Sequence, residues 1–215
     1  MKVEIKHLTL SRFINMSAHG GVDDILEFLG TSAPPERIRI GIKTYPVPQT
    51  ADELRESLTY GQKLFLSEQP KGDLDLLLRM FVGWYYPILT NKPFDADKAF
   101  NVAGKSFRCF IEELIPACAH IAKLVSELNE FEEQVLTSEP DSLWMQAGGG
   151  GLSKYAPMLT VEYLAGKLKC TNDDVFDKPY SECLFWLMYQ NESNAVEKRF
   201  NQLNIEKAKH GSRNP

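Results

Sequence analysis

Apolar residues recur at helical spacing along most of this chain, and two segments repeat one pattern. Residues 8–29 and 58–81 each begin with Leu-Thr and an apolar run, then break, then restart with Gly and Asp ahead of a second apolar run. Threonine and aspartate are preferred at helix N-termini, so each copy is predicted to form a helix, a break and a second helix. A unit repeated inside one chain, with no nucleophile or metal cluster in either copy, is more typical of packing and binding than of chemistry.

Two further stretches predict the most buried helices. Residues 74–85 carry a strong 3.6-residue apolar stripe, and this helix is expected to end near Pro87. A heptad-like seam follows, which needs a neighbouring helix along its length. Pro116 interrupts that seam and removes a helical hydrogen bond, so a kink or a fresh helix start with Pro116 in the first turn is expected. The seam consists of Phe107, Ile111, Leu114, Cys118, Ile121, Val125 and Leu128.

Strand-like segments are few and lie near the N-terminus. Residues 2–6 and 37–43 alternate polar and apolar side chains, as a strand with one buried face does, and the two can pair nonlocally. Elsewhere the capping residues favour helices: Thr50 is a predicted N-cap with Glu53 completing a capping box, and Asp95 is predicted to cap another short helix. The predicted fold class is mainly α, a helical bundle with a small N-terminal β element and a long C-terminal helix.

The stretch 137–158 has the composition of an internal linker. It contains Pro140 and the four consecutive glycines 148–151, with Trp144 and Met145 between them. Glycine adds chain flexibility, which favours a hinge, and the alternative is a backbone stretch that approaches another surface closely. The predicted domain organisation is a mostly helical, repeat-containing domain at 1–136, the linker at 137–158 and a helical segment at 159–215.

The C-terminal segment ends in a long predicted helix with a polar interruption at 190–194. Its first half is expected to pack on the body, and beyond the interruption Val196, Phe200 and Leu203 recur at helical spacing. Either these three side chains fold back on the body, or they form a stripe that binds a groove on a partner or on a second copy. They are the predicted partner-binding residues, together with Trp144 and Met145.

Composition narrows the class of protein. The 215 residues are 43% hydrophobic and 25% charged, which is ordinary for a globular chain. The net charge of −5 argues against nucleic acid as the main partner, because phosphate binding normally needs a basic surface. Four scattered cysteines do not form a disulfide framework, and the longest apolar stretch is too short and too polar to span a membrane, so a reducing cytoplasm is the expected compartment.

Candidate chemistry is sparse. Cys118 and His120 are two residues apart, but zinc sites need three or four ligands and no second pair lies nearby. The aspartate pairs lie at predicted helix starts, where carboxylates stabilise free amides. The glycines at 148–151 are not followed by the Lys-Ser/Thr of a phosphate-binding loop. No catalytic residue, metal or cofactor is therefore predicted, and the chain is not expected to be an enzyme.

Short motifs between Leu58 and Leu203, about two thirds of the chain, carry a family resemblance. They are Leu-Thr-Tyr-Gly-Gln from Leu58, Trp84-Tyr85-Tyr86-Pro87, Pro93-Phe94-Asp95, the stretch 159–166, and Lys178-Pro179-Tyr180 before the charged terminal helix. In this order they resemble the tail-assembly or virion-morphogenesis proteins of tailed bacteriophages, especially phages and prophages of Bacteroides-like bacteria. The tetraglycine and the segment 37–43 depart from that pattern.

The resemblance implies a non-enzymatic, homo-oligomeric protein that binds other phage tail or connector proteins through helices. For a tail-assembly chaperone the client would be the long tape-measure protein, and the chain would act in the host cytoplasm during assembly. The alternative is a structural component of the virion, such as a ring or connector subunit at the head–tail junction.

Overall fold

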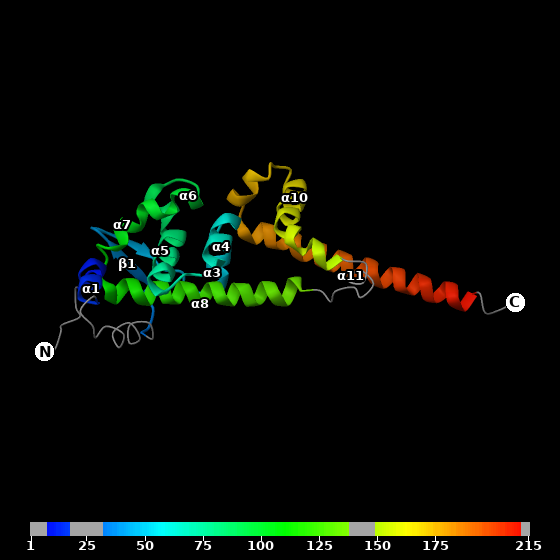
Figure 1. Ribbon diagram of the computed structural model, residues 1–215, viewed down its shortest axis with the longest axis horizontal. Coiled ribbons are helices and arrows are strands. Elements are labelled where there is room, and N and C mark those ends of the chain that lie inside the picture. Colours follow the sequence, from blue (N-terminus) through cyan, green and yellow to red (C-terminus); the bar gives the residue numbers. More distant parts are fainter. Residues whose placement is uncertain (1–7, 18–31, 138–148, 212–215) are drawn as a thin grey trace. The chain divides into compact units, whose positions relative to one another are not determined.

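Helices dominate the structure. The computed structural model describes residues 8–17, 32–137 and 149–211, which form a mainly α fold with a two-stranded antiparallel sheet near the N-terminus and a long C-terminal helix (Figure 1). The predicted fold class is therefore confirmed. The strand expected at residues 2–6 lies outside the described residues.

The chain divides into two compact units that do not follow the order of the sequence. One comprises Met1–Asn129 with Phe176–Tyr180, and the other comprises Glu130–Val175 with Ser181–Pro215. The linker and domain boundaries predicted from the sequence stay predictions.

Short helices and a hairpin precede the first long helix. In chain order they are α1 (Leu10–Ser17), β1 (Arg37–Ile40), β2 (Lys43–Pro46), α3 (Ala51–Ser57), α4 (Tyr60–Ser67), α5 (Asp73–Thr90), α6 (Ala96–Ala99), η1 (Phe100–Val102), α7 (Ala103–Ser106) and α8 (Ile111–Leu136). The rest of the chain forms η2 (Gly149–Tyr155), α10 (Ala156–Leu168), η3 (Asp173–Asp177) and α11 (Tyr180–Gly211). As predicted, Asp95 caps α6, since its side chain accepts a hydrogen bond from Lys98 N at 3.2 Å.

The Leu-Thr starts of the two repeat copies build the same backbone joint. Thr9 forms an isolated antiparallel bridge with Phe110, directly before α8, and Thr59 forms one with Pro179, directly before α11. Equivalent hydrogen bonds surround each bridge. At the first, Leu10 N donates to Cys109 O at 3.0 Å and Ile111 N donates to Leu8 O at 2.9 Å. At the second, Tyr60 N donates to Lys178 O and Tyr180 N donates to Leu58 O, both at 2.9 Å. Each joint therefore ties the start of a short helix to the start of a long one.

The second repeat copy has the predicted shape, with α4, a break and α5 in succession. The first copy begins with α1, and its residues 18–29 lie outside the described residues. That the two copies superpose stays a prediction.

The segment predicted as one strand at 37–43 is instead a hairpin. Strands β1 and β2 pair antiparallel in the register Arg37 with Pro46 and Ile40 with Lys43, so Gly41 and Ile42 form a two-residue turn. Gly41 has a φ of 67°, which glycine adopts without strain at the first position of a type II′ turn. In the sequence, Ile42 continues the alternation of apolar residues, but in the structure it lies in the turn and is 99% exposed. It therefore does not belong to the buried face of the hairpin.

Helix α5 was predicted to end near Pro87, and it continues past that residue to Thr90. Proline lacks the N–H that would bond to the carbonyl of Gly83, four residues earlier. Gln62 of α4 supplies a donor instead, because its Nε2 donates to Gly83 O at 2.9 Å in a buried setting. A Cβ on Gly83 would overlap the Leu66 side chain, so glycine is required for this close approach of α4 to α5.

Helix α8 places the predicted seam in the core. From Ile111 to Leu128 the six seam residues are each at most 5% exposed. The helix begins at Ile111 instead of Phe107, which lies in the preceding turn, and it is continuous through Pro116, so a fresh start at Pro116 is wrong. Burial of each large apolar side chain contributes roughly 1.5–3 kcal/mol, and the five Ile, Leu and Val residues of the seam together outweigh the roughly 3 kcal/mol cost of an internal proline.

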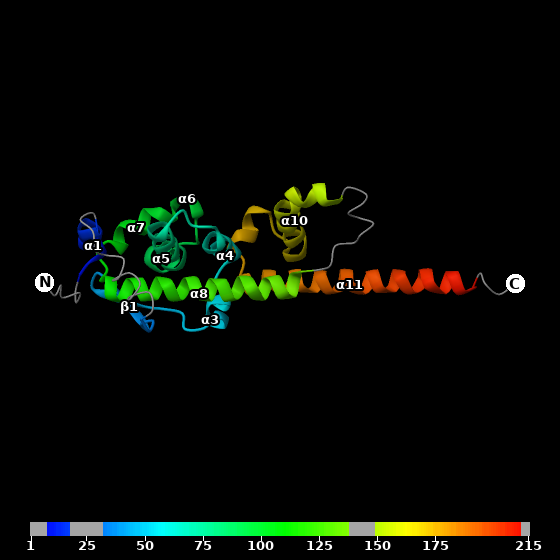
Figure 2. The ribbon, with the colours of Figure 1, turned by 60° about the horizontal axis from the view of Figure 1, so that its bottom comes forward.

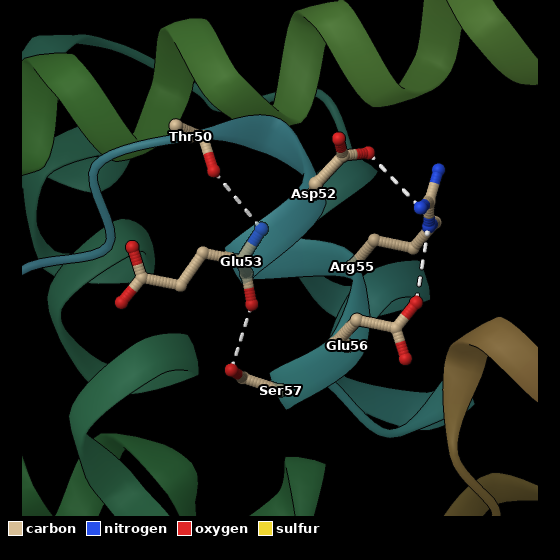
Figure 3. A network of polar contacts seen from close by, with 6 residues as sticks. All are labelled: Thr50, Asp52, Glu53, Arg55, Glu56 and Ser57. Atoms are coloured by element: carbon tan, nitrogen blue, oxygen red, sulfur yellow. Dashed lines mark hydrogen bonds and ion pairs between the residues drawn. The ribbon is translucent and has the colours of Figure 1, made fainter.

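The predicted cap at Thr50 is confirmed, but the reciprocal half of its capping box is replaced. Thr50 Oγ1 accepts from Glu53 N at 3.1 Å, while the Glu53 carboxylate accepts from Gln49 N at 2.8 Å instead of from Thr50 N (Figure 3 shows the contacts of α3). A complete box occurs one helix later, between Thr59 and Gln62 at the start of α4. Gln62 therefore serves both the α4 cap and the carbonyl that proline leaves free in α5.

Helix α10 begins at Ala156, three residues before its predicted start at Leu159. Pro157 lies in the first turn, where the missing N–H has no helical partner to lose. The preceding residues Gly149–Tyr155 form η2. A Cβ on Gly151 would meet no atom within 4 Å, so no close approach of another segment requires glycine at that position.

Candidate functional site

The first turns of α11 are buried and its second half is exposed. Tyr180, Cys183 and Leu184 are at most 3% exposed, whereas Val196, Phe200 and Leu203 are 56%, 62% and 56% exposed. Figures 1 and 2 both show the second half of α11 extending beyond α10. Both alternatives left by the sequence, that the three side chains fold back on the body and that they bind a partner or a second copy, stay predictions.

Two residues that the sequence reasoning missed extend this surface. Phe185 and Tyr189 are 59% and 52% exposed, although the first half of the helix was predicted to be packed. At 3.6 residues per turn, these two and the three predicted residues lie within about 60° of one another around the helix axis. The spacing of four, seven, four and three residues could have revealed them. We call Phe185, Tyr189, Val196, Phe200 and Leu203 the α11 stripe.

Helix α10 contacts α11 at Trp186, beside the start of the stripe. Tyr163 Oη donates to the Trp186 carbonyl at 3.1 Å, and the Lys167 ammonium lies 5.6 Å from the centroid of the Trp186 ring. The Trp186 ring also makes edge-on contacts with Phe185 and Tyr189, at centroid distances of 5.4 and 5.9 Å. These contacts hold the aromatic end of the stripe in place, and partial burial raises the pKa of Tyr163.

The polar run 190–194 fixes the middle of α11. Asn191 Nδ2 donates to the Val135 carbonyl at 2.9 Å, and Val135 lies in the last turn of α8, where carbonyls have no helical partner. Gln190 and Asn194, four residues apart, hydrogen-bond to each other at 2.7 Å. A segment that looked merely polar in the sequence therefore caps a second helix.

The remaining predicted partner-binding residues, Trp144 and Met145, lie outside the described residues. A second exposed apolar group adjoins that region on η2 and α10. It consists of Leu152, Tyr155, Met158 and Leu159, which are 46–62% exposed. The first three of them lie in the predicted linker at 137–158. Their exposure is seen only in the structure, because the sequence does not show which linker side chains are covered.

Three of the four cysteines are buried, as packing residues are. Cys109, Cys118 and Cys183 are buried free thiols. Burial raises the pKa of Cys109 to about 12 and raises the pKa of Cys118 as well, so both thiols are protonated and poorly nucleophilic near neutral pH.

Within the described residues, no group of three or more His, Cys, Asp or Glu side chains is arranged to hold a metal ion. In the same part of the chain, no helix has the length and apolar character needed to cross a membrane. Comparisons with protein-family models, with curated proteins and with solved structures gave no match.

Proposed function

We propose that this chain is a non-enzymatic assembly protein of a tailed bacteriophage, a tail-assembly chaperone that binds another tail protein through α11. The resemblance between residues 58 and 203 supports the phage class and makes the tape-measure protein the proposed client. Its place of action would be the host cytoplasm during assembly. The α11 stripe supports the proposal, because an exposed apolar face on one helix is the kind of surface that binds a groove on a partner.

Exposing the apolar stripe to water is unfavourable, because apolar surface is more stable when it is buried. Five large apolar side chains are exposed on one face of one helix, and apolar surface gathered in this way is typical of protein interaction sites. An amphipathic helix of this form binds when its apolar face enters a groove on a partner. Phe200 is the natural anchor, because large aromatic side chains supply a disproportionate share of binding energy when a partner covers them.

Truncating the stripe tests the proposal directly. The full chain would be co-purified with the tape-measure protein encoded in the same genome, and the affinity measured for the wild type and for the double variant Phe200→Ala with Leu203→Ala. Binding should weaken by about 1–3 kcal/mol, roughly 5- to 150-fold. The melting temperature of the isolated chain, measured at a concentration where it is monomeric, should barely move, because both side chains are exposed within one chain.

Ile205→Ala is the matched control. Ile205 is 55% exposed on the same helix, but it lies nine residues from Val196, about two and a half turns away and therefore on the opposite face. It should leave binding unchanged. A double variant that melts early yet still binds its client would show that Phe200 and Leu203 are core residues and that the proposal is wrong.

Mass spectrometry of purified phage particles separates the chaperone from the alternative role. A chaperone acts during assembly and should be absent from mature particles. A fixed copy number in virions would instead identify a ring or connector subunit at the head–tail junction.

A further inference from the structure

The α11 stripe has a spacing that reads almost the same in both directions. A heptad seam runs through 186, 189, 193, 196, 200 and 203 when the half-buried Trp186 takes the place of Phe185 and the half-buried, polar Ser193 is included. This set maps onto itself when it is reversed about its midpoint. A seam with this symmetry can pair with an identical helix running in the opposite direction. Tyr189 would then face the partner's Phe200, and Ser193 would face the partner's Val196.

The charges beside the seam favour the same arrangement. Glu192 and Arg199 are both exposed and lie on one flank of the stripe, seven residues apart. When two identical helices run antiparallel, the same flank of each helix meets its counterpart. In the register that pairs Tyr189 with the partner's Phe200, Glu192 lies beside the partner's Arg199, and the contact occurs twice by symmetry.

Other arrangements of two copies bring like charges together. In a parallel pair, opposite flanks meet and Glu192 approaches the partner's Glu197. In an antiparallel pair centred on Arg199, the two arginines meet each other, and Glu192 meets the partner's Glu206. Such juxtapositions are destabilising, and they select the antiparallel register centred between residues 194 and 195.

We infer that α11 pairs antiparallel with α11 of a second copy of this chain, covering the stripe through the Tyr189–Phe200 and Ser193–Val196 layers and the Glu192–Arg199 ion pairs. The inference rests on the proposed function in that it assigns a partner to the same surface. Self-pairing would cover the stripe before the client arrives, and client binding would then compete with it.

Charge reversal tests both the partner and the register. Sedimentation velocity would be run on the full chain over a concentration series, under reducing conditions and at two salt concentrations. The wild type should dimerise with increasing concentration, and more weakly at high salt. Arg199→Glu should raise the dimer dissociation constant by about tenfold or more, because it converts both ion pairs into Glu–Glu contacts. Adding Glu192→Arg to that variant should restore dimerisation.

Two controls make the outcome decisive. Lys198→Glu makes the same charge change on the face of α11 away from the stripe and should leave the dimer unchanged, and circular dichroism should show equal helix content in every variant. A wild type that stays monomeric, an Arg199→Glu variant that dimerises normally, or rescue by Glu206→Arg instead of Glu192→Arg would overturn the inferred pairing. A monomeric chain that still binds its client would refute self-pairing alone, and a dimer without client binding would refute the proposed function alone.

Discussion

Helices α8 and α11 start alike and differ in what covers them. Each begins directly after a backbone bridge to a Leu-Thr segment, and each carries apolar residues at helical spacing. Along α8 the seam from Ile111 to Leu128 is at most 5% exposed, whereas the α11 stripe is 52–62% exposed. The same periodic pattern has become core in one helix and surface in the other.

The comparison shows what hydrophobic spacing can and cannot decide. Spacing defines which side chains share a face, because that follows from the geometry of one helix. Whether the face becomes core or interface depends on the segments that pack against it. The exposed α11 stripe and the buried α8 seam also differ slightly in composition. Glu192 and Ser193 interrupt the middle of the α11 stripe, whereas the α8 seam contains no charged residue.

The largest expected effect comes from one substitution made in both helices. Leu114→Ala in α8 removes a fully buried side chain and should lower the free energy of unfolding by about 2–5 kcal/mol, measured by urea denaturation. Leu203→Ala in α11 should change it by less than about 0.5 kcal/mol, since that side chain is exposed. Equal losses for the two variants would mean that the stripe is covered within the isolated chain.

A smaller effect is expected from Gln62→Leu. This variant introduces an apolar side chain of similar size. It removes the acceptor that bonds to Thr59 N and the donor to the Gly83 carbonyl, and the buried Gly83 acceptor left unpaired costs about 1–3 kcal/mol. Hydrogen exchange should also quicken in the last turn of α5, beyond Pro87. Gln202→Leu on exposed α11 is the control and should have little effect. If Gln62→Leu also left stability and hydrogen exchange unchanged, the hydrogen bond from Gln62 would not be the reason that α5 continues past Pro87.

The smallest effect concerns Lys63 of α4 and depends on pH. Burial lowers the pKa of its ammonium from the ordinary 10.5 to about 8, and the ammonium lies 5.5 Å from the centroid of the Tyr180 ring. Between pH 8 and 10.5 the unfolded chain holds a proton that the folded chain has released, so this residue makes stability rise with pH in that window. Below pH 8 both states are protonated and the full burial cost remains.

Lys63→Met should therefore stabilise the chain at pH 7 by about 1–2 kcal/mol, after allowance for the lost cation–π contact. Its advantage over the wild type should shrink as the pH rises from 8 to 10, as followed by thermal unfolding at each pH. Lys198→Met, on exposed α11, should show no such trend. An advantage that stays constant with pH would contradict a lowered pKa for Lys63.

Part of the candidate site was predictable because it depends on local geometry. Spacing within one helix places Val196, Phe200 and Leu203 on one face, and all three are exposed. That they bind a partner stays a prediction. Phe185 and Tyr189 were missed because the first half of α11 was assumed to be covered throughout. The roles of Trp144 and Met145 stay predictions.

By itself, the sequence determined the helices, their apolar faces and several caps, because helical periodicity and N-cap hydrogen bonds involve residues only a few positions apart. Tertiary structure decided the rest. Ile42 belongs to a turn because residues 37–40 pair with 43–46, and α5 passes Pro87 because Gln62, distant in sequence, donates to Gly83. Among the residues that the structure describes, the burial of the α8 seam and the exposure of the α11 stripe likewise depend on contacts between distant segments, which no local pattern contains.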